Sequence, residues 1–276
     1  MNTPASSDRT KKKGWAVVTG ASAGLGVEFA RQLAARGYDL VLVARRVEPM
    51  EELATALRAE RGVRVEVIAL DLGARGSAEV LESMLAEKQI ETELLVNNAG
   101  FGTHAPALEI TIERSLAMID LNVASLTDLA LRFGKRMAAR GHGAIINVAS
   151  IGGFQPDPYF AVYGATKAYV LSFSTALSAE LASSGVRVLC CCPGPTATEF
   201  NLVGHVTADS PSFLEMSAAR CVRITLRAFD WGRWVIVTGF INWLVVYFSR
   251  RLPLWLSTRG SGFALRPGKK KLPATP

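Results

Sequence analysis

Between residues 14 and 189 the chain alternates short apolar runs with longer segments in which apolar positions recur at the period of a helix. The apolar runs are nearly unbroken, as in strands that are covered on both faces. Such an alternation predicts repeated strand–helix–strand units and a parallel sheet. Seven strands are expected, at residues 15–20, 39–44, 64–70, 93–98, 143–150, 186–192 and 233–239.

The segments between these strands predict helices that pack on both faces of the sheet. They cover residues 26–38, 47–62, 77–89, 112–140 and 159–185, and four of them end at a glycine, namely Gly37, Gly62, Gly141 and Gly185. A glycine just before the next strand is typical of a helix C-cap. The predicted fold is therefore a single-domain α/β protein, a Rossmann-like doubly wound parallel sheet of about seven strands.

Hydropathy and cysteine spacing favour a cytoplasmic protein. The longest apolar segment, residues 234–248, contains Gly239 and Asn242 and is shorter than the roughly 20 residues of a spanning helix. The first 14 residues lack the apolar core of a signal peptide. The four cysteines, three of them consecutive at 190–192 and one at Cys221, match neither a disulfide framework nor a zinc site. We expect them in the core, and we expect no metal.

The net charge of +7 is concentrated at the two ends of the chain. Residues 1–13 carry four bases and one acid, residues 14–203 carry 16 bases and 20 acids, and residues 204–276 carry 11 bases and three acids. A nucleic-acid-binding protein would spread its bases over a folded face, so no nucleic-acid partner is expected. We predict a folded domain over 14–263 between two basic tails, 1–13 and 264–276.

A glycine-rich turn joins the first strand to the first helix. Residues 19–26 read TGASAGLG, with Gly20, Gly24 and Gly26 in the turn. Glycines at this place let the backbone turn tightly and let a pyrophosphate approach the first N–H groups of the helix, which carry partial positive charge. The spacing differs from the G-x-G-x-x-G of other dinucleotide folds, but the context predicts a dinucleotide site.

The end of the second strand bears on the choice of cofactor. An acidic residue there would accept a hydrogen bond from the free 2′-hydroxyl of NAD, and this chain has Arg45 and Arg46 instead. Two guanidinium groups suit a 2′-phosphate. The alternative is that they begin a solvated loop. We favour NADP(H) over NAD(H).

Tyr163 and Lys167 stand four residues apart in a predicted helix, so they share one face. Taken alone, this spacing is more often a surface coincidence. The pair also suits carbonyl chemistry, because the phenol has an ordinary pKa of about 10 and a nearby ammonium would lower it toward the working range. The meaning of the pair depends on its surroundings.

Six motifs resemble those of the short-chain dehydrogenase/reductase family and occur in its order over residues 14–203. They are TGASAGLG at 19–26, NNAG at 97–100, LNV around Asn122, NVAS ending at Ser150, YGATK at 163–167 and PGPTATEF at 193–200. The resemblance implies a catalytic group of Asn122, Ser150, Tyr163 and Lys167. It also implies cofactor contacts from Tyr163, Lys167, Gly20, Ser22, Gly24, Leu25, Gly26, Arg45, Arg46, Asp71, Asn98, Gly100, Pro193, Gly194 and Thr198.

The implied roles fit the chemistry of the side chains. Tyr163 would supply the proton in a carbonyl reduction, and Lys167 would lower its pKa and hold the nicotinamide ribose. Ser150 would stabilise charge on the substrate oxygen, and Asn122 would hold a water that replenishes the proton. The structural alternatives are a turn cap for Ser150 and a helix N-cap for Asn122. His104 and His142 are assigned no role.

Beyond residue 200 the resemblance weakens, where the family has its substrate loop and C-terminal helices. Residues 204–276 contain four of the five tryptophans together with the basic charge. This end is interpreted, in order of preference, as a lid over an apolar pocket, a dimer contact, or a segment in a membrane interface over 240–276. Each interpretation implies a lipophilic or extended substrate, and the basic rim would suit an acyl-CoA or a carrier-bound thioester.

The sequence thus predicts an NADP(H)-dependent oxidoreductase that reduces a ketone or 3-oxoacyl group to a secondary alcohol, or catalyses the reverse. A homodimer or homotetramer in the cytoplasm is expected. One alternative is a regulator that binds NADP(H) without turnover, and another is a peripheral membrane enzyme that modifies lipids. The substrate and the physiological direction are not determined by the sequence.

Overall fold

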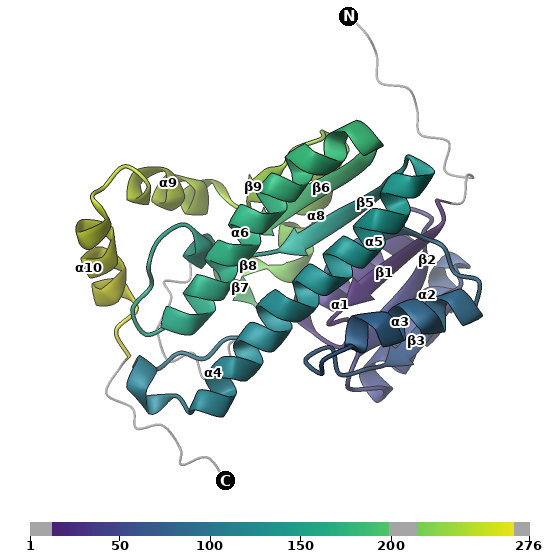
Figure 1. Cartoon of the computed structure of the whole chain (residues 1–276), viewed down its shortest axis with the longest axis horizontal. Coiled ribbons are helices and arrows are strands. Elements are labelled where there is room, and N and C mark those ends of the chain that lie inside the picture. Colours follow the sequence, from purple (N-terminus) through teal and green to yellow (C-terminus); the bar gives the residue numbers. More distant parts are fainter. Residues whose placement is uncertain (1–12, 199–214, 268–276) are drawn as a thin grey trace, which may run out of the picture.

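A seven-stranded parallel sheet forms the centre of the computed structural model, which describes residues 13–198 and 215–267 (Figure 1). The strand order is β3-β2-β1-β4-β5-β6-β9, and each adjacent pair is parallel. All seven predicted strands are confirmed, within a few residues. They are β1 (Trp15–Thr19), β2 (Asp39–Ala44), β3 (Val65–Ala69), β4 (Thr92–Asn97), β5 (Gly143–Val148), β6 (Val186–Cys192) and β9 (Val235–Val237).

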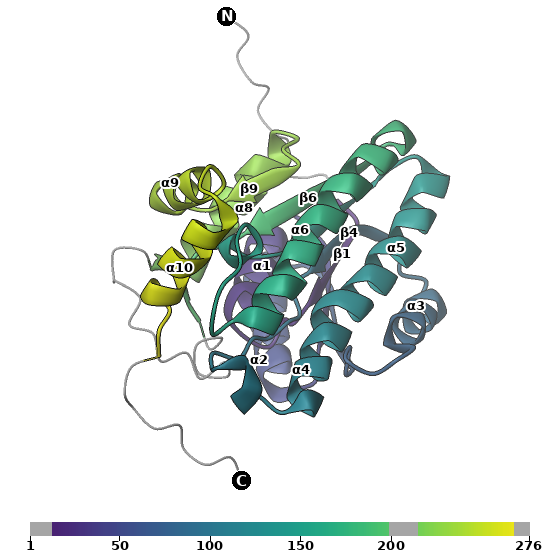
Figure 2. The ribbon, with the colours of Figure 1, turned by 60° about the vertical axis from the view of Figure 1, so that its left-hand side comes forward.

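Helices cover both faces of the sheet, as the sequence predicts (Figures 1 and 2). On one face, side chains such as Phe29, Leu57 and Leu226 pack against the strands, and on the other Leu81 and Leu129 do so. The first face carries α1 (Gly24–Ala34), α2 (Glu48–Arg61) and α8 (Ala218–Asp230). The second carries α3 (Ser77–Glu87), α5 (Leu126–Arg140) and α6 (Ala161–Leu181).

The carboxyl ends of the strands meet at one edge of the sheet because the strands are parallel. The strand order reverses between β1 and β4, the place where doubly wound folds form a crevice. The predicted glycine turn follows β1, the two arginines follow β2, Asn98 follows β4 and Ser150 lies just beyond β5. The topology therefore brings the predicted motifs to a single edge.

The predicted helix over 112–140 is divided into three parts. These are α4 (Ile112–Ile119), a π-helical segment η2 (Asp120–Ser125) and α5. A π-helical turn accommodates one residue more than an α-helical turn, and such turns are frequent at functional sites. Asn122 lies within this turn, so its alternative reading as an N-cap is wrong.

Shorter irregular elements and helix ends refine the other predictions. Gly62 and Gly141 are left-handed C-caps of α2 and α5, and Gly185 caps the short 3-10 helix η4 (Ala182–Ser184). Helix α1 ends earlier than predicted, with Ala35 as its C-cap, and Gly37 follows with a φ of 85°. Two further 3-10 helices, η1 (Ala107–Glu109) and η3 (Ile151–Gly153), lie in loops.

The long apolar segment at 234–248 folds as strand β9 followed by helix α9 (Phe240–Ser249), with a break at Gly239. Helix α10 (Leu254–Ala264) follows, after Pro253. A small parallel sheet of β7 (Thr196–Ala197) and β8 (Met216–Ser217) was not predicted. Over the described residues, no helix is long and apolar enough to cross a membrane. The start of the expected substrate loop, 199–214, lies outside the described residues, as do 1–12 and 268–276 of the tails.

A buried amide network ties the two central strands to α6. Asn97 in β4 donates from Nδ2 to Oδ1 of Asn147 in β5 at 3.0 Å, and Asn147 donates to Oγ of Ser174 in α6 at 2.9 Å. Asn147 and Ser174 have no solvent-exposed surface. Because buried polar groups need their partners, this network fixes the register between the strands and α6.

We predict that Asn147→Ala lowers the free energy of unfolding by about 1–3 kcal/mol, because Asn97 and Ser174 each lose a buried partner. Urea unfolding followed by circular dichroism measures the change. Ser174→Ala removes only one hydrogen bond and should cost less. Equal stability of Asn147→Ala and the wild type would contradict the proposed importance of the network.

Candidate active site

The glycine turn after β1 has the conformation that a phosphate site requires. Gly20 and Gly24 have φ values of 65° and 55°, in the left-handed region that favours glycine. A Cβ atom on Gly26 would overlap the carbonyl oxygen of Gly20. Helix α1 begins at Gly24, and its N-cap residue, Ala23, provides no side-chain hydrogen bond. The N–H of Gly26 donates to the carbonyl oxygen of Ala23 at 3.2 Å, and the N-terminus of α1, which has no side-chain cap from Ala23, suits an anion.

Asn98 holds this turn against the end of β4. Its Nδ2 donates to the carbonyl oxygen of Thr19 at 2.9 Å and to that of Gly20 at 3.3 Å. Its backbone N–H donates to Oγ1 of Thr19 at 2.9 Å. In this structure Asn98 acts as a brace for the turn, at the border of the predicted cofactor cleft.

Guanidinium groups gather beside the turn. Arg46 donates from Nη2 to the backbone oxygen and Oγ of Ser22 at 3.3 and 3.4 Å. Burial lowers the pKa of Arg114 in α4, and the positive charge of the nearby Arg45, which is exposed, lowers it further. Arg114 also donates to Oγ1 of Thr103 at 3.2 Å. The sequence analysis missed Arg114, because only the fold brings α4 near the loop after β2.

The remaining predicted cofactor residues lie along the same edge. Leu25 packs against the core under α1, and Oδ1 of the exposed Asp71 accepts a hydrogen bond from the N–H of Gly73 at 3.0 Å. The carbonyl oxygen of Pro193 accepts from Ile151 at 2.9 Å. Gly194 packs tightly against the side chain of Asn242, and a Cβ on Gly24 would lie 3.0 Å from Cβ of Thr198.

Ser150, Tyr163 and Lys167 come together just beyond the end of β5. Ser150 forms a side-chain hydrogen bond with Tyr163. Lys167 is buried, donates from Nζ to the carbonyl oxygen of Val148 at 2.8 Å, and lies 5.7 Å from the centre of the Tyr163 ring. Oγ of Ser150 also accepts from the N–H of Gly152 at 3.1 Å, so it caps η3 as the structural alternative expected. The cap and the contact with Tyr163 coexist.

Burial dominates the electrostatics of this group. Burial raises the pKa of Tyr163 to about 12, although the hydrogen bond from Ser150 lowers it. Burial also lowers the pKa of Lys167 to about 8, although the neighbouring cysteines raise it. The direction for Tyr163 is opposite to the one expected from Lys167. The ammonium is held by the Val148 carbonyl and is itself desolvated, so it does not offset the burial of the phenol.

Asn122 lies beside Lys167 on the wall formed by Gly100. A Cβ on Gly100 would lie 2.9 Å from Oδ1 of Asn122 and 3.5 Å from Nζ of Lys167. Oδ1 of Asn122 accepts from the N–H of Phe101 at 3.1 Å, and its Nδ2 donates to the Phe101 carbonyl oxygen and to Oγ1 of Thr166 at 2.8 and 3.1 Å. Both amide protons are therefore used within the protein, and the water-holding role of Asn122 stays a prediction.

A partly buried carboxyl group, that of Asp157, lies beside these residues and was not predicted from the sequence. Asp157 follows η3, and a Cβ on Gly152 would lie 2.6 Å from its Oδ2. Burial raises the pKa of Asp157 to about 6, although hydrogen bonds from Gln155 and Ser261 oppose this. Its charge in turn raises the pKa of Tyr163. No local pattern marks Asp157 in the sequence.

The C-terminal helix α10 is attached to the loop that leads into the catalytic helix. Oγ of Ser261 donates to the Pro156 carbonyl oxygen at 2.8 Å. His104 is buried, its Nε2 lies 2.7 Å from the Leu265 carbonyl oxygen, and its ring stacks on Phe160 with centroids 4.6 Å apart. Phe160 in turn contacts Tyr163 at 5.5 Å. These contacts attach the C-terminal end to the residues around Tyr163.

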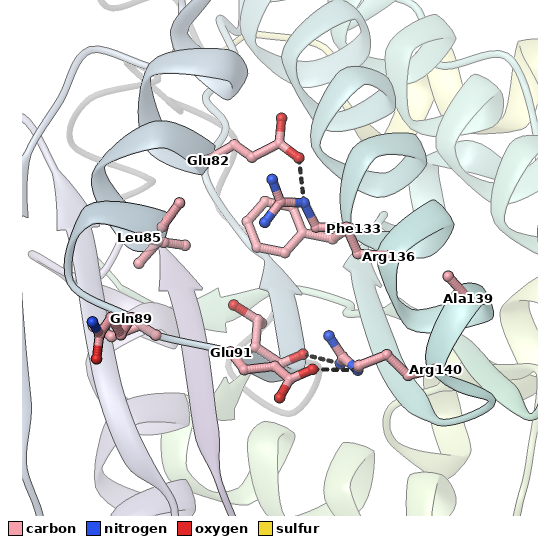
Figure 3. A pocket seen from close by; sticks show the side chains of 11 residues that line it. Glu82, Leu85, Gln89, Glu91, Phe133, Arg136, Ala139 and Arg140 are labelled. Carbon is pink, nitrogen blue, oxygen red and sulfur yellow. Dashed lines mark hydrogen bonds and ion pairs between the residues drawn. The ribbon is translucent and has the colours of Figure 1, made fainter.

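His142, by contrast, lies away from the site and pairs with Glu93 at 3.1 Å. A hollow of about 430 Å³ also lies away from it, between α3, α5 and the start of β4 (Figure 3). Ion pairs join Arg136 to Glu82 and Arg140 to Glu91 across this hollow. It opens at the amino end of β4, so it belongs to the opposite edge of the sheet.

The arrangement fits a nicotinamide dinucleotide and carbonyl chemistry. The glycine turn and the open N-terminus of α1 suit a pyrophosphate, and the small residues Gly20, Gly24 and Gly100 leave a cradle that side chains would fill. When bound, the cofactor supplies or accepts a hydride. Tyr163 would then exchange a proton with the substrate oxygen, and Ser150 would donate a hydrogen bond to that oxygen.

The chain belongs to the short chain dehydrogenase family, whose model matches residues 14–203. It is 34% identical over 202 residues to very-long-chain 3-oxoacyl-CoA reductase-B of Danio rerio, which covers 72% of this chain and 64% of that protein. The chain thus spans less than two thirds of that relative.

Solved structures agree with the family assignment. A short-chain dehydrogenase from Sphingobium yanoikuyae in complex with NADPH matches with a TM-score of 0.78 and 34% identity, over 86% of this chain and 93% of that chain. A bulky-bulky ketone specific alcohol dehydrogenase from Comamonas testosteroni matches with a TM-score of 0.75 and 32% identity, over 87% and 93%. The predicted family and fold are confirmed.

We predict that the rate of carbonyl reduction falls as the pH rises through about 8. Tyr163 stays protonated in this range because its pKa is about 12, whereas Lys167 loses its proton near pH 8. The pH profile of kcat measures this alkaline limb. In Lys167→Arg the alkaline fall in the remaining kcat should move above pH 10, because a guanidinium group keeps its charge there. A wild-type limb at that higher pH would contradict the assignment.

Proposed function

We propose that this protein is an NADP(H)-dependent reductase that converts a ketone or a 3-oxoacyl carbonyl to a secondary alcohol, or catalyses the reverse. The observation that carries the proposal is the hydrogen-bonded Ser150–Tyr163 pair with the buried Lys167, at the same sheet edge as the phosphate turn. The 3-oxoacyl-CoA and ketone specificities named for two similar proteins support this class of substrate.

Each side chain has a role that its surroundings support. Tyr163 exchanges the proton, and its raised pKa keeps it in the donor form needed for reduction. Ser150 orients the substrate oxygen toward it. Lys167 holds the cofactor ribose and carries the positive charge behind the phenol. Asn122 keeps the π-helical turn in place beside Lys167 through its contacts with Phe101 and Thr166.

The proposed preference for NADP(H) rests on positive charge beside the adenosine end of the cleft. Arg46 touches the phosphate turn at Ser22, and Arg45 shares its electrostatic environment with Arg114. Guanidinium groups bind phosphate through paired hydrogen bonds, so this cluster suits a 2′-phosphate. The NADPH bound by the Sphingobium yanoikuyae protein is consistent with the proposal.

A lipophilic substrate and a peripheral membrane contact through residues 240–276 complete the proposal. Helices α9 and α10 expose large apolar side chains, among them Phe240, Phe248 and Trp255, which are 72%, 60% and 62% exposed. We place the enzyme in the cytoplasm with this end at a membrane surface. Exposed Ile112, Leu116 and Leu131 on α4 and α5 support a homodimer or homotetramer through another face.

We predict that Tyr163→Phe lowers kcat for ketone reduction by about 10²–10⁴-fold, because the proton donor is lost. NADPH affinity, measured by fluorescence titration, should change by less than about threefold, since the ring stays in place. A matched control is Tyr169→Phe in the same helix, which removes only a hydroxyl paired with Thr127 at 2.9 Å. It should keep the wild-type rate.

The same measurements separate the enzyme from a regulator that only binds cofactor. Saturable NADPH binding by the wild type, with no oxidation of NADPH across a panel of ketones and 3-oxoacyl thioesters, would favour the regulator. Wild-type rates in Tyr163→Phe would refute Tyr163 as the proton donor while leaving the reductase class intact.

We predict that Arg45→Ala weakens NADPH binding by about 10- to 100-fold, because charge-assisted hydrogen bonds to a 2′-phosphate are lost. The affinity for NADH should change by less than about threefold, because NADH has no 2′-phosphate. Fluorescence titration with both cofactors measures the ratio. Arg61→Ala, which removes an exposed arginine at the end of α2, is the matched control. Equal losses for NADPH and NADH would contradict the 2′-phosphate site.

A further inference from the structure

A groove of about 1030 Å³ lies between α8, β9 and α9, at the outer edge of the sheet. Figure 2 shows these three elements together on one side of the molecule, with α10 beside them. Aromatic and arginine side chains dominate the lining, namely Phe154, Trp231, Trp243, Tyr247, Arg227, Arg233, Arg250 and Arg251. The groove is distinct from the hydrogen-bonded group at the end of β5.

The charge around the groove is strongly positive. Residues 218–264 contain seven arginines and one acidic residue, Asp230, which pairs with Arg36 at 3.0 Å. Among the residues that the structure describes, no carboxylate lines the groove. Throughout the described parts of the chain, none of the seven arginines forms an ion pair. A cluster of like charges without acidic partners attracts an anion from outside the chain.

Aromatic rings hold two of these guanidinium groups at the groove. The guanidinium of Arg251 lies over the Tyr247 ring at 3.5 Å and donates to the Tyr247 carbonyl oxygen at 2.9 Å. That of Arg250 lies over the Phe154 ring at 5.9 Å. Stacking on a ring limits the motion of a long side chain, so less entropy is lost when the guanidinium binds a phosphate.

The helix that forms one wall of the groove, α9, is predominantly apolar. The segment from Phe240 to Ser249 has no charged residue, and only Asn242 and Val246 in it are buried. Trp243 lines the groove and is 46% exposed. Exposed apolar residues with tryptophans and arginines at their border are the composition of a segment that lies in the interface of a bilayer.

We propose that this groove binds the phosphate of an anionic phospholipid in the membrane on which α9 and α10 lie. The proposal rests on the peripheral membrane contact proposed above and assigns its headgroup site. The arginines would hold the phosphate in bidentate hydrogen bonds, and the tryptophans would lie at the level of the headgroups. The apolar side chains of α9 would face the acyl chains. The unpaired positive charge matches an anionic surface better than a neutral one.

Headgroup binding would place the active site next to the membrane. Phe154, which lines the groove, directly follows η3 and lies four residues from Ser150. Asn242 of α9 packs against Gly194 in the loop after β6. Phe154 and α9 therefore join the groove to the loops that follow β5 and β6, an arrangement that suits a substrate dissolved in the bilayer.

The test compares sedimentation of the full chain with two kinds of vesicle, phosphatidylcholine alone and phosphatidylcholine mixed with phosphatidylglycerol. The wild type should bind the mixed vesicles more tightly, and added salt should weaken this preference. In Arg250→Gln/Arg251→Gln the preference should fall by about 20- to 30-fold, since each arginine near an anionic surface contributes about fivefold. The control Arg61→Gln/Arg75→Gln removes two exposed arginines of the loop and helix around β3 and should retain the preference.

Competition identifies the source of the phosphate. Inorganic phosphate at the same concentration as the lipid headgroup should not release the protein from mixed vesicles, whereas short-chain phosphatidylglycerol should. Brominated lipids should quench tryptophan fluorescence in the bound protein, and less so in Trp243→Phe. Release by inorganic phosphate alone would show a free-phosphate site and overturn the proposal.

Two other outcomes would also overturn it. Equal binding to both kinds of vesicle would show membrane contact without a headgroup site. A stable dimer that hides these tryptophans and binds no vesicle would identify a second copy of the chain as the occupant. Activity on a water-soluble ketone without vesicles is measured in parallel, so a reductase that binds no anionic lipid refutes the groove and leaves the proposed activity standing.

Discussion

The site depends on one buried ammonium group, that of Lys167. Its Nζ donates to the carbonyl oxygen of Val148, the last residue of β5, at 2.8 Å. Removing this charge from water is costly, which lowers its pKa to about 8, and the carbonyl provides the compensating contact. The bond fixes α6 to the end of β5. Because Tyr163 is one turn earlier on the same helix, its place beside Ser150 follows from that bond.

A second set of contacts organises the cofactor-binding edge of the sheet, where the strand order reverses between β1 and β4. The N-cap residue Ala23 provides no capping side chain for the turn after β1, whose Gly20 and Ala21 N–H groups donate to the Val43 carbonyl oxygen at 2.8 and 3.4 Å. Asn98 holds the turn instead from β4, through two carbonyl oxygens. The amide network of Asn97, Asn147 and Ser174 extends the same bracing from β4 to α6. The two halves of the site are thus joined through the core of the sheet.

The C-terminal helices α9 and α10 connect the candidate active site to the exposed surface of the protein. Ser261 attaches α10 to the loop before α6 through the Pro156 carbonyl oxygen, and Leu265, just after α10, contacts His104 in the loop after β4. Helix α9 packs on Gly194 with one side and leaves most of its apolar side chains exposed. A displacement of α9 or α10 at the exposed surface would therefore be transmitted through these contacts to the residues around Tyr163. This connection gives the C-terminal end of the chain a structural role in the site.

The strands, their helices, the glycine turn and the Tyr163–Lys167 pair could be predicted from the sequence, because each depends on local periodicity or on spacing within one element. Only the folded structure shows which residues of different elements come into contact. Arg114 beside Arg45 and the groove that joins Phe154 to α8 and α9 are contacts between distant segments. The raised pKa of Tyr163 belongs with them, because burial is the sum over all neighbours, and no spacing in the chain records that sum.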